Sequence, residues 1–332
     1  MFKIGYRTIK TAIGTALAII ISQSMSLENF VSAGIITILC IQNTKKKSLQ
    51  AAWSRFRACT IAIIFCAIFF EGIGFHPLMI GLLLLFFIPT VVALKVKEGI
   101  VTSSVIILHM YSAGEITKSV ILNEYGIIIV GMGIALLMNL YMPSLEKRLY
   151  RLQDEIEENF RRIFQEIAMY LRDNQHVWDG KEITETVKLI KEGKEFAFQD
   201  IENHFLREEK LFYSYFSMRQ KQFERIERVL SIITSISHQV EQAHVIADFM
   251  EELGERIHPG NTAHLSLQKL ERMRAEFEKM DLPATREEFE SRAALLQFIK
   301  EMEEYLLIKS SFKGMKRESR PSYIREAREA GS

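Results

Sequence analysis

The sequence predicts an all-α protein: a six-helix transmembrane bundle followed by a cytoplasmic antiparallel helical bundle. Apolar residues are concentrated before Met142, whereas the chain from Pro143 onward is dense in Glu, Lys and Arg at helical spacing. The net charge also changes sign, because the first 142 residues carry 11 Lys/Arg and 5 Asp/Glu, a net +6, and the rest is net −5. We therefore expect a membrane domain over 1–142, a helical bundle over 143–312 and a disordered polar tail over 313–332.

Six apolar segments of the first half approach the roughly 20 residues that a helix needs to cross a bilayer. They cover residues 8–25, 27–43, 56–72, 75–94, 99–113 and 120–142. The second, third and fifth are short. We still interpret them as spans, because short buried helices would need a large soluble domain around them that this half does not contain. Basic residues precede the first segment as in a signal peptide, but its small residues lie inside the run, which favours an uncleaved first helix.

The distribution of basic residues predicts the orientation in the membrane. With the N-terminus inside, ten of the eleven Lys and Arg residues of this half fall on the inner side and only Lys118 falls outside. An even number of spans returns the chain to the same side. We therefore expect a multi-pass protein of the cell membrane, in contact with lipid, whose N- and C-termini are both cytoplasmic.

The soluble half is predicted to contain five helices. The first begins after Ser144, a candidate N-cap, and we expect its buried face to hold the apolar residues 149, 152, 156, 160, 163, 167 and 171. Their spacing repeats every 11 positions (149, 160, 171), which is typical of a nearly straight helix. The last begins after Leu282-Pro283, where Thr285 and Glu288 have the spacing of a capping box. The helices between them are expected over about 182–207, 209–253 and up to about 280, the long third one uninterrupted.

Several classes of function are disfavoured by the same residues. The basic excess belongs to short loops and the acidic half has no basic stripe, which argues against nucleic acid. Cys40, Cys59 and Cys66 lie in or beside apolar segments without a CxxC pair, so we expect them to pack as small apolar residues. No nucleophile with a base, glycine loop for phosphate or metal-ligand spacing is present. We expect no enzyme activity, cofactor or metal.

Three segments together resemble the aromatic acid exporter family. They are Gly5-Tyr6-Arg7-Thr8-Ile9-Lys10-Thr11 opening the first span, Gln42-Asn43-Thr44 with Ser48 and Arg55 after the second, and Leu282-Pro283 to Arg292 in the soluble half. The resemblance covers nearly the whole chain. In that family a six-span N-terminal half is joined to a helical C-terminal domain, within a wider group that includes fusaric acid resistance transporters. After Arg57, where the family has a glycine-rich stretch, this chain has Ala58-Cys59-Thr60-Ile61-Ala62.

The resemblance implies efflux of aromatic carboxylic acids driven by the proton gradient. Such transport needs cations that attract a carboxylate at the inner mouth, and the candidates are Arg7 and Lys10, which begin the first span, and Arg55 and Arg57, which begin the third. The alternative is that all four snorkel to the headgroups. His109 in the fifth span is the candidate for proton coupling, since histidine titrates near neutral pH. A neutral histidine hydrogen-bonded across helices is the alternative.

We therefore expect an integral membrane exporter of small organic anions that is coupled to protons. Six spans make a small pathway, so a homo-oligomer that lines the route between subunits is expected. The competing hypothesis is a membrane-anchored scaffold or sensor whose cytoplasmic bundle binds a partner. The two differ in the polar face of the spans: an exporter requires Arg55, His109 and residues 102–104 to converge on one cavity, whereas an anchor would scatter them into separate pairs.

Overall fold

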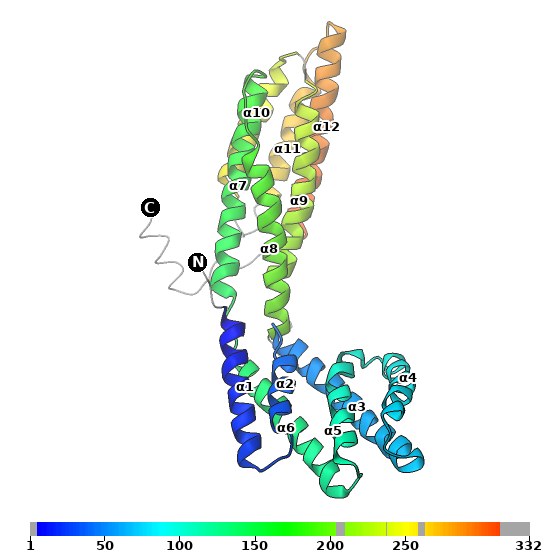
Figure 1. The fold of residues 1–332 in the computed structure, drawn as a ribbon. Helices are drawn as coiled ribbons and strands as arrows, with labels where there is room; N and C mark the ends of the chain where they lie inside the picture. The colour runs from blue at the N-terminus through cyan, green and yellow to red at the C-terminus, as the bar shows by residue number, and fades with distance from the viewer. Residues whose placement is uncertain (1–4, 204–209, 237, 258–262, 313–332) are drawn as a thin grey trace. The chain divides into compact units, whose positions relative to one another are not determined.

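The computed structural model describes residues 5–203, 210–236, 238–257 and 263–312, and every regular element within them is a helix (Figure 1). The chain divides into two compact units. One is Met1–Pro143 with Ile201–Leu206, and the other is Ser144–Asp200 with Arg207–Ser332. We call them the membrane unit and the soluble unit and describe each by itself.

Each of the six apolar segments forms a helix in the membrane unit. These are α1 (Tyr6–Ser24), α2 (Val31–Cys40), α3 (Lys45–Cys66) continued by the π-helical turn η1 (Ala67–Glu71), α4 (Pro77–Ala93), α5 (Ile100–Ala113) after the 3-10 turn η2 (Lys97–Gly99), and α6 (Lys118–Leu140). Within the described residues, two helices are long and apolar enough to cross a membrane, Lys45–Glu71 and Lys118–Leu140, while Val31–Cys40 and Pro77–Ala93 are shorter apolar helices. The count of six spans therefore stays a prediction.

The third helix begins 11 residues earlier than the segment 56–72 that the sequence predicts. Thr44 is its N-cap, and the Thr44 hydroxyl accepts a hydrogen bond of 3.3 Å from the backbone N–H of Lys47. The three lysines that follow Thr44 form the first turn of α3 and not a loop. Arg55 and Arg57 consequently lie in the third and fourth turns of a long helix and do not begin it, whereas their place at the start of the third span stays a prediction.

Small residues allow the helices of the membrane unit to approach closely. A Cβ on Gly131 of α6 would lie 2.7 Å from the backbone oxygen of Ala33 in α2. A Cβ on Gly99 would lie only 2.3 Å from the Cβ of Ala58, in the stretch where α3 lacks the glycines of the family pattern. Close packing is thus preserved at this point, because the glycine is supplied by η2 and the alanine by α3.

The soluble unit contains six helices among its described residues. They are α7 (Glu146–Arg172), α8 (Lys181–Asn203, whose last three residues belong to the membrane unit), α9 (Leu211–Ile233), α10 (Glu241–Glu255), α11 (Ala263–Phe277) and α12 (Arg286–Ser310). α7 packs along α10, and α12 packs along α9 and α11 (Figure 1). The apolar positions predicted for the first helix are all buried in α7: Leu149, Leu152, Ile156, Phe160, Ile163, Ile167 and Leu171.

The predicted uninterrupted helix over 209–253 is wrong, because the chain leaves the helix after Ile233 and resumes at Glu241. The hydroxyls of Thr234 and Ser235 donate to the backbone oxygens of Ser231 and Ile232, at 3.0 and 2.6 Å. Such local hydrogen bonds offer the backbone an alternative to the helix. The break lets α10 fold back and bury its apolar face against α7.

The predicted start of the last helix is confirmed. The backbone N–H of Glu288 donates to the Thr285 hydroxyl at 3.1 Å, and the Glu288 carboxylate accepts from the backbone N–H of Ala284 at 2.8 Å. The Ala284 hydrogen bond, together with Arg292, holds the pKa of Glu288 below its usual value. The tail predicted over 313–332 lies outside the described residues.

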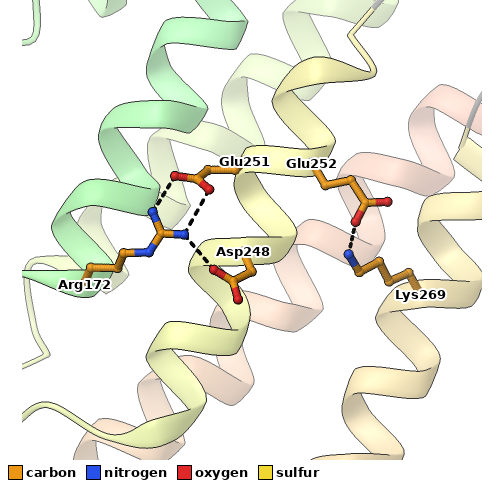
Figure 2. A network of polar contacts seen from close by, with 5 residues as sticks. All are labelled: Arg172, Asp248, Glu251, Glu252 and Lys269. Carbon is orange, nitrogen blue, oxygen red and sulfur yellow. Dashed lines mark hydrogen bonds and ion pairs between the residues drawn. The ribbon is translucent and has the colours of Figure 1, made fainter.

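Ion pairs connect α7, α10 and α11 at the surface of the soluble unit (Figure 2). Arg172, the last residue of α7, donates to Asp248 at 2.6 Å and binds both carboxylate oxygens of Glu251, one of them at 2.9 Å. These contacts raise the pKa of Arg172 and lower that of Glu251. Glu252, on the same helix as Glu251, pairs with Lys269 of α11. Because the pairs are partly exposed, they contribute little to the free energy of unfolding, and we infer that they mainly align the three helices.

Candidate functional site

His109 forms a buried acid–base pair in the membrane unit. Its Nδ1 lies 3.0 Å from Oε2 of Glu124 on α6, and its Nε2 lies 3.1 Å from the hydroxyl of Ser32 on α2. The side chain of Glu124 is 2% exposed and that of His109 14%. The histidine therefore bridges three helices, α2, α5 and α6, at a point from which solvent is nearly excluded.

The second oxygen of the Glu124 carboxylate is also hydrogen-bonded. Asn123 donates to it at 3.3 Å, and the same amide group exchanges two hydrogen bonds with the backbone of Glu28, at 2.8 and 3.2 Å. With Glu124 ionised, a neutral imidazole donates to it through Nδ1 and accepts from Ser32 through Nε2; an imidazolium donates through both nitrogens. The pair can therefore hold either of two proton counts without rearranging its partners.

Glu124 and Ser32 were missed from the sequence, although a signal for Glu124 was present. It is an acidic residue inside the segment 120–142, and an ionisable side chain in such a run is itself a sign of function. Ser32 carried no comparable signal, because serine hydroxyls in apolar helices usually bond to their own backbone.

Arg55 is a buried cation of this unit, with 8% of its surface exposed. Its Nη1 donates to the backbone oxygen of Glu98 and to the Thr102 hydroxyl at 3.2 Å, and its Nη2 donates to the backbone oxygen of Leu39 at 3.2 Å. Its Nε has no hydrogen-bond partner among the described residues. The guanidinium thus joins α3 to α2, η2 and α5 through three of its five N–H donors.

The Arg55 and His109 contacts occupy the same faces of α2 and α5. Leu39 and Ser32 are seven residues apart on α2, and Thr102 and His109 are seven residues apart on α5. Seven residues are two helical turns, about 10 Å. Ile106 lies between the two sites on α5 and is fully buried. The structure therefore aligns Arg55 and His109 along one interface but does not bring them into one open cavity.

The predicted polar patch over 102–104 contributes one residue to this interface. Thr102 accepts from Arg55, whereas the hydroxyls of Ser103 and Ser104 donate to the backbone oxygens of Gly99 and Ile100, at 2.7 and 2.8 Å. Only Thr102 of the three therefore connects α5 to another helix through its hydroxyl in the part of the chain that the structure describes.

Lys10 forms a second polar cluster at the predicted inner side. It is 4% exposed, and its Nζ donates to Oδ1 of Asn139 at 2.6 Å. The Asn139 amide donates to the Ser48 hydroxyl and to the backbone oxygen of Gln42 at 3.3 Å. Residues of α1, α6 and α3 are thereby connected with the segment between α2 and α3.

Arg7 and Arg57, the other two predicted cations, are exposed. Arg7 donates to the backbone oxygen of Ile41 at 3.3 Å, and the Arg57 guanidinium lies 6.0 Å from the centre of the Trp53 ring. The four predicted cations therefore divide into a buried pair, Lys10 and Arg55, and an exposed pair.

Comparison with known proteins connects this arrangement to a family. Residues 2–142 match the model described as "Aromatic acid exporter family member 1", and residues 146–310 match the "Putative aromatic acid exporter C-terminal domain". The chain belongs to the aromatic acid exporter family. Membership in this family indicates a membrane exporter.

A relative in Bacillus subtilis (strain 168), "Uncharacterized protein YqjA", is 62% identical over 316 residues, which are 95% of this chain and 98% of the relative. A crystal structure of a "putative membrane protein" from Clostridium difficile 630 is similar at 22% identity, with a TM-score of 0.45. That similarity covers 49% of this family member and 96% of the solved chain.

Proposed function

We propose that this exporter moves small organic anions, in particular aromatic carboxylates, out of the cell in exchange for protons. The observation that carries the proposal is the His109–Glu124 pair, which joins three helices at 3.0 and 3.1 Å in the interior of the membrane unit. Burying an ionisable pair in a membrane is costly, which favours a functional role. Proton entry changes the charge of the pair and reverses the direction of the hydrogen bond between Ser32 on α2 and His109 on α5.

We assign substrate binding to the four predicted cations, with distinct roles. Arg55 is buried and keeps an unpartnered Nε, so its planar fork suits a carboxylate. Lys10 is the second buried cation. Arg7 and Arg57 are exposed and would attract anions to the inner surface before they bind.

The proposal includes a topology with both termini in the cytoplasm and a homo-oligomer. The fully buried Ile106 fills the space between the Arg55 and His109 sites. A substrate route within one subunit would therefore require α2 and α5 to separate. A route along the contact between subunits would require less rearrangement, which supports an oligomer.

The test is uptake of labelled benzoate into inside-out vesicles bearing the purified protein, with and without an acidic lumen. We compare wild type with His109→Ala, Glu124→Gln and Arg55→Ala. His76→Ala and Lys118→Ala are matched controls, because both residues are exposed and neither is assigned to substrate binding or proton transfer. We expect an acidic lumen to stimulate uptake by wild type and both controls. The His109 and Glu124 variants should lose this stimulation, and the Arg55 variant should lose uptake itself.

The competing function, a membrane-anchored scaffold, gives a different result. Correctly inserted wild-type protein would then take up no aromatic carboxylate under any gradient. Uptake that depends on Arg55 but ignores the gradient would retain export and reject proton coupling.

A further inference from the structure

A large groove lies between α7 and α8 in the soluble unit, far along the chain from the residues assigned to transport. Its volume is about 1150 Å³. The residues that line it lie between Ser144, just before α7, and Arg162 of α7, and between Glu185 and Leu189 in the first half of α8. This volume is sufficient for a small organic ligand.

The rim of the groove carries five cations and four carboxylates, an excess of one positive charge. Two of the cations are neutralised on their own helix, because Arg151 pairs with Glu155 at 3.5 Å and Arg162 with Glu158 at 3.2 Å. Lys147 of α7 and Lys188 of α8 make no ion pair within the described ranges. One such cation therefore stands on each helix of the groove.

Asn159 places an unsatisfied donor beneath the lining of the groove. It is 7% exposed and lines the groove, and its Nδ2 has no hydrogen-bond partner among the residues that the structure describes. Buried amide donors are normally satisfied, so an unpartnered one at a binding surface indicates a missing acceptor. A carboxylate oxygen is such an acceptor.

The walls of the groove also offer apolar surface. Tyr150 is buried and Leu189 is half-buried, one from each helix. Beside them the Arg148 guanidinium lies 3.8 Å from the centre of the Phe196 ring and pairs with Glu192 at 2.5 Å, which fixes the two helices to each other. The groove thus combines two apolar lining residues with a donor and two cations.

We infer that the groove between α7 and α8 is a second binding site for a small aromatic monocarboxylate. The ring lies against Tyr150 and Leu189, and the carboxylate accepts from Asn159 and is attracted by Lys147 and Lys188. The rim carries a single excess positive charge, which suits a monoanion better than a polyanion. The choice of ligand rests on the proposed function, and the site would let the soluble unit detect the anion that the membrane unit exports.

The test is equilibrium dialysis of labelled benzoate against the full-length protein in nanodiscs. The Arg55→Ala variant is the host, because it removes the proposed membrane site. Asn159→Leu and the double variant Lys147→Gln/Lys188→Gln are made in this host. Lys191→Gln and Gln165→Leu are the controls, since both residues are exposed on the same helices and do not line the groove. Benzyl alcohol and benzene-1,3,5-tricarboxylate are the uncharged and trianionic competitors.

We expect saturable binding of benzoate to the host, weakened about fivefold or more by Asn159→Leu and by the double lysine variant and unchanged by both controls. The tricarboxylate and the alcohol should compete poorly. Absence of binding, equal binding by all variants, or preference for the trianion would each overturn the inference. Transport in vesicles is measured separately. Binding without transport would reject the proposed export function and leave the inferred groove site standing. Transport without binding would support export and reject the groove site.

Discussion

Arg219 is the residue whose replacement should destabilise the soluble unit most. It is 1% exposed, and its guanidinium donates to the Tyr215 hydroxyl at 3.0 Å, to Gln222 at 3.1 Å and to Glu157 at 3.5 Å. Tyr215 in turn donates to the same Glu157 oxygen at 2.7 Å. These side chains join α7 to α9, and the Gln222 amide extends the network to the backbone oxygen of Tyr305 on α12 at 3.1 Å.

Replacing Arg219 by Met removes the cation and leaves the Glu157 carboxylate, 3% exposed, without a counter-charge from α9. Breaking a buried pair from one side costs about 3–5 kcal/mol. For a unit of this size about 1 kcal/mol shifts the melting temperature by roughly 2–4 °C, so a fall of about 6–20 °C is expected. Adding Glu157→Met should recover most of the loss, because the double variant leaves no buried charge on either helix of the pair.

Thermal unfolding of the full chain in detergent measures the fall in melting temperature. The two tryptophans lie in different units, so Trp53→Phe leaves Trp178 as a fluorescence reporter of the soluble unit. Arg228→Met is the matched control, since Arg228 is on the same helix but 61% exposed and should shift melting by at most a degree or two. A loss below about 1 kcal/mol for Arg219→Met, or no recovery in the double variant, would refute the assigned role of the pair.

Three further changes test other parts of the structure. Glu124→Gln should abolish the stimulation of benzoate uptake by an acidic lumen, measured in vesicles; persistence of stimulation would reject the buried pair as the proton carrier. Gly99→Ala should destabilise the membrane unit by about 1–3 kcal/mol, because the new Cβ would lie 2.3 Å from that of Ala58. The fluorescence of Trp53 reports the melting of this unit, and an unchanged melting temperature would contradict the close approach. Burial, with a smaller contribution from a neighbouring guanidinium, lowers the pKa of Lys309 from 10.5 to about 6. Between these pH values the unfolded chain binds a proton that the folded chain does not. The free energy of unfolding therefore falls as the pH drops from 10.5 to 6. Lys309→Met should flatten this slope in melting curves recorded from pH 6 to 10, and an equal slope in both proteins would contradict it.

The pattern of apolar residues predicted the helices of this chain well where one face of a helix is buried along its whole length. α7 is the clearest case, because each of its predicted core positions is buried. The break after Ile233 was not predicted, since the apolar spacing continues through Ile236 and Val240, which are themselves buried. Periodicity gives the face that a residue occupies, but the side-chain hydrogen bonds that end a helix compete with it locally. The start of α3 was missed for the opposite reason: three lysines look like a loop, yet they follow an N-cap threonine.

The candidate site shows a second limit of sequence-based prediction: the sequence does not tell which helices are neighbours. Spacing places Thr102 and His109 on one face of α5, but nothing in the sequence says that α2 and α6 supply Ser32 and Glu124 to that face. One feature could have been obtained from spacing alone. Arg55 and Arg57 are two residues apart, about 200° around a helix, so only one of them can face the interior of the bundle. The structure buries Arg55 and exposes Arg57, and any carboxylate bound between α2, α3 and α5 therefore meets one arginine of the two.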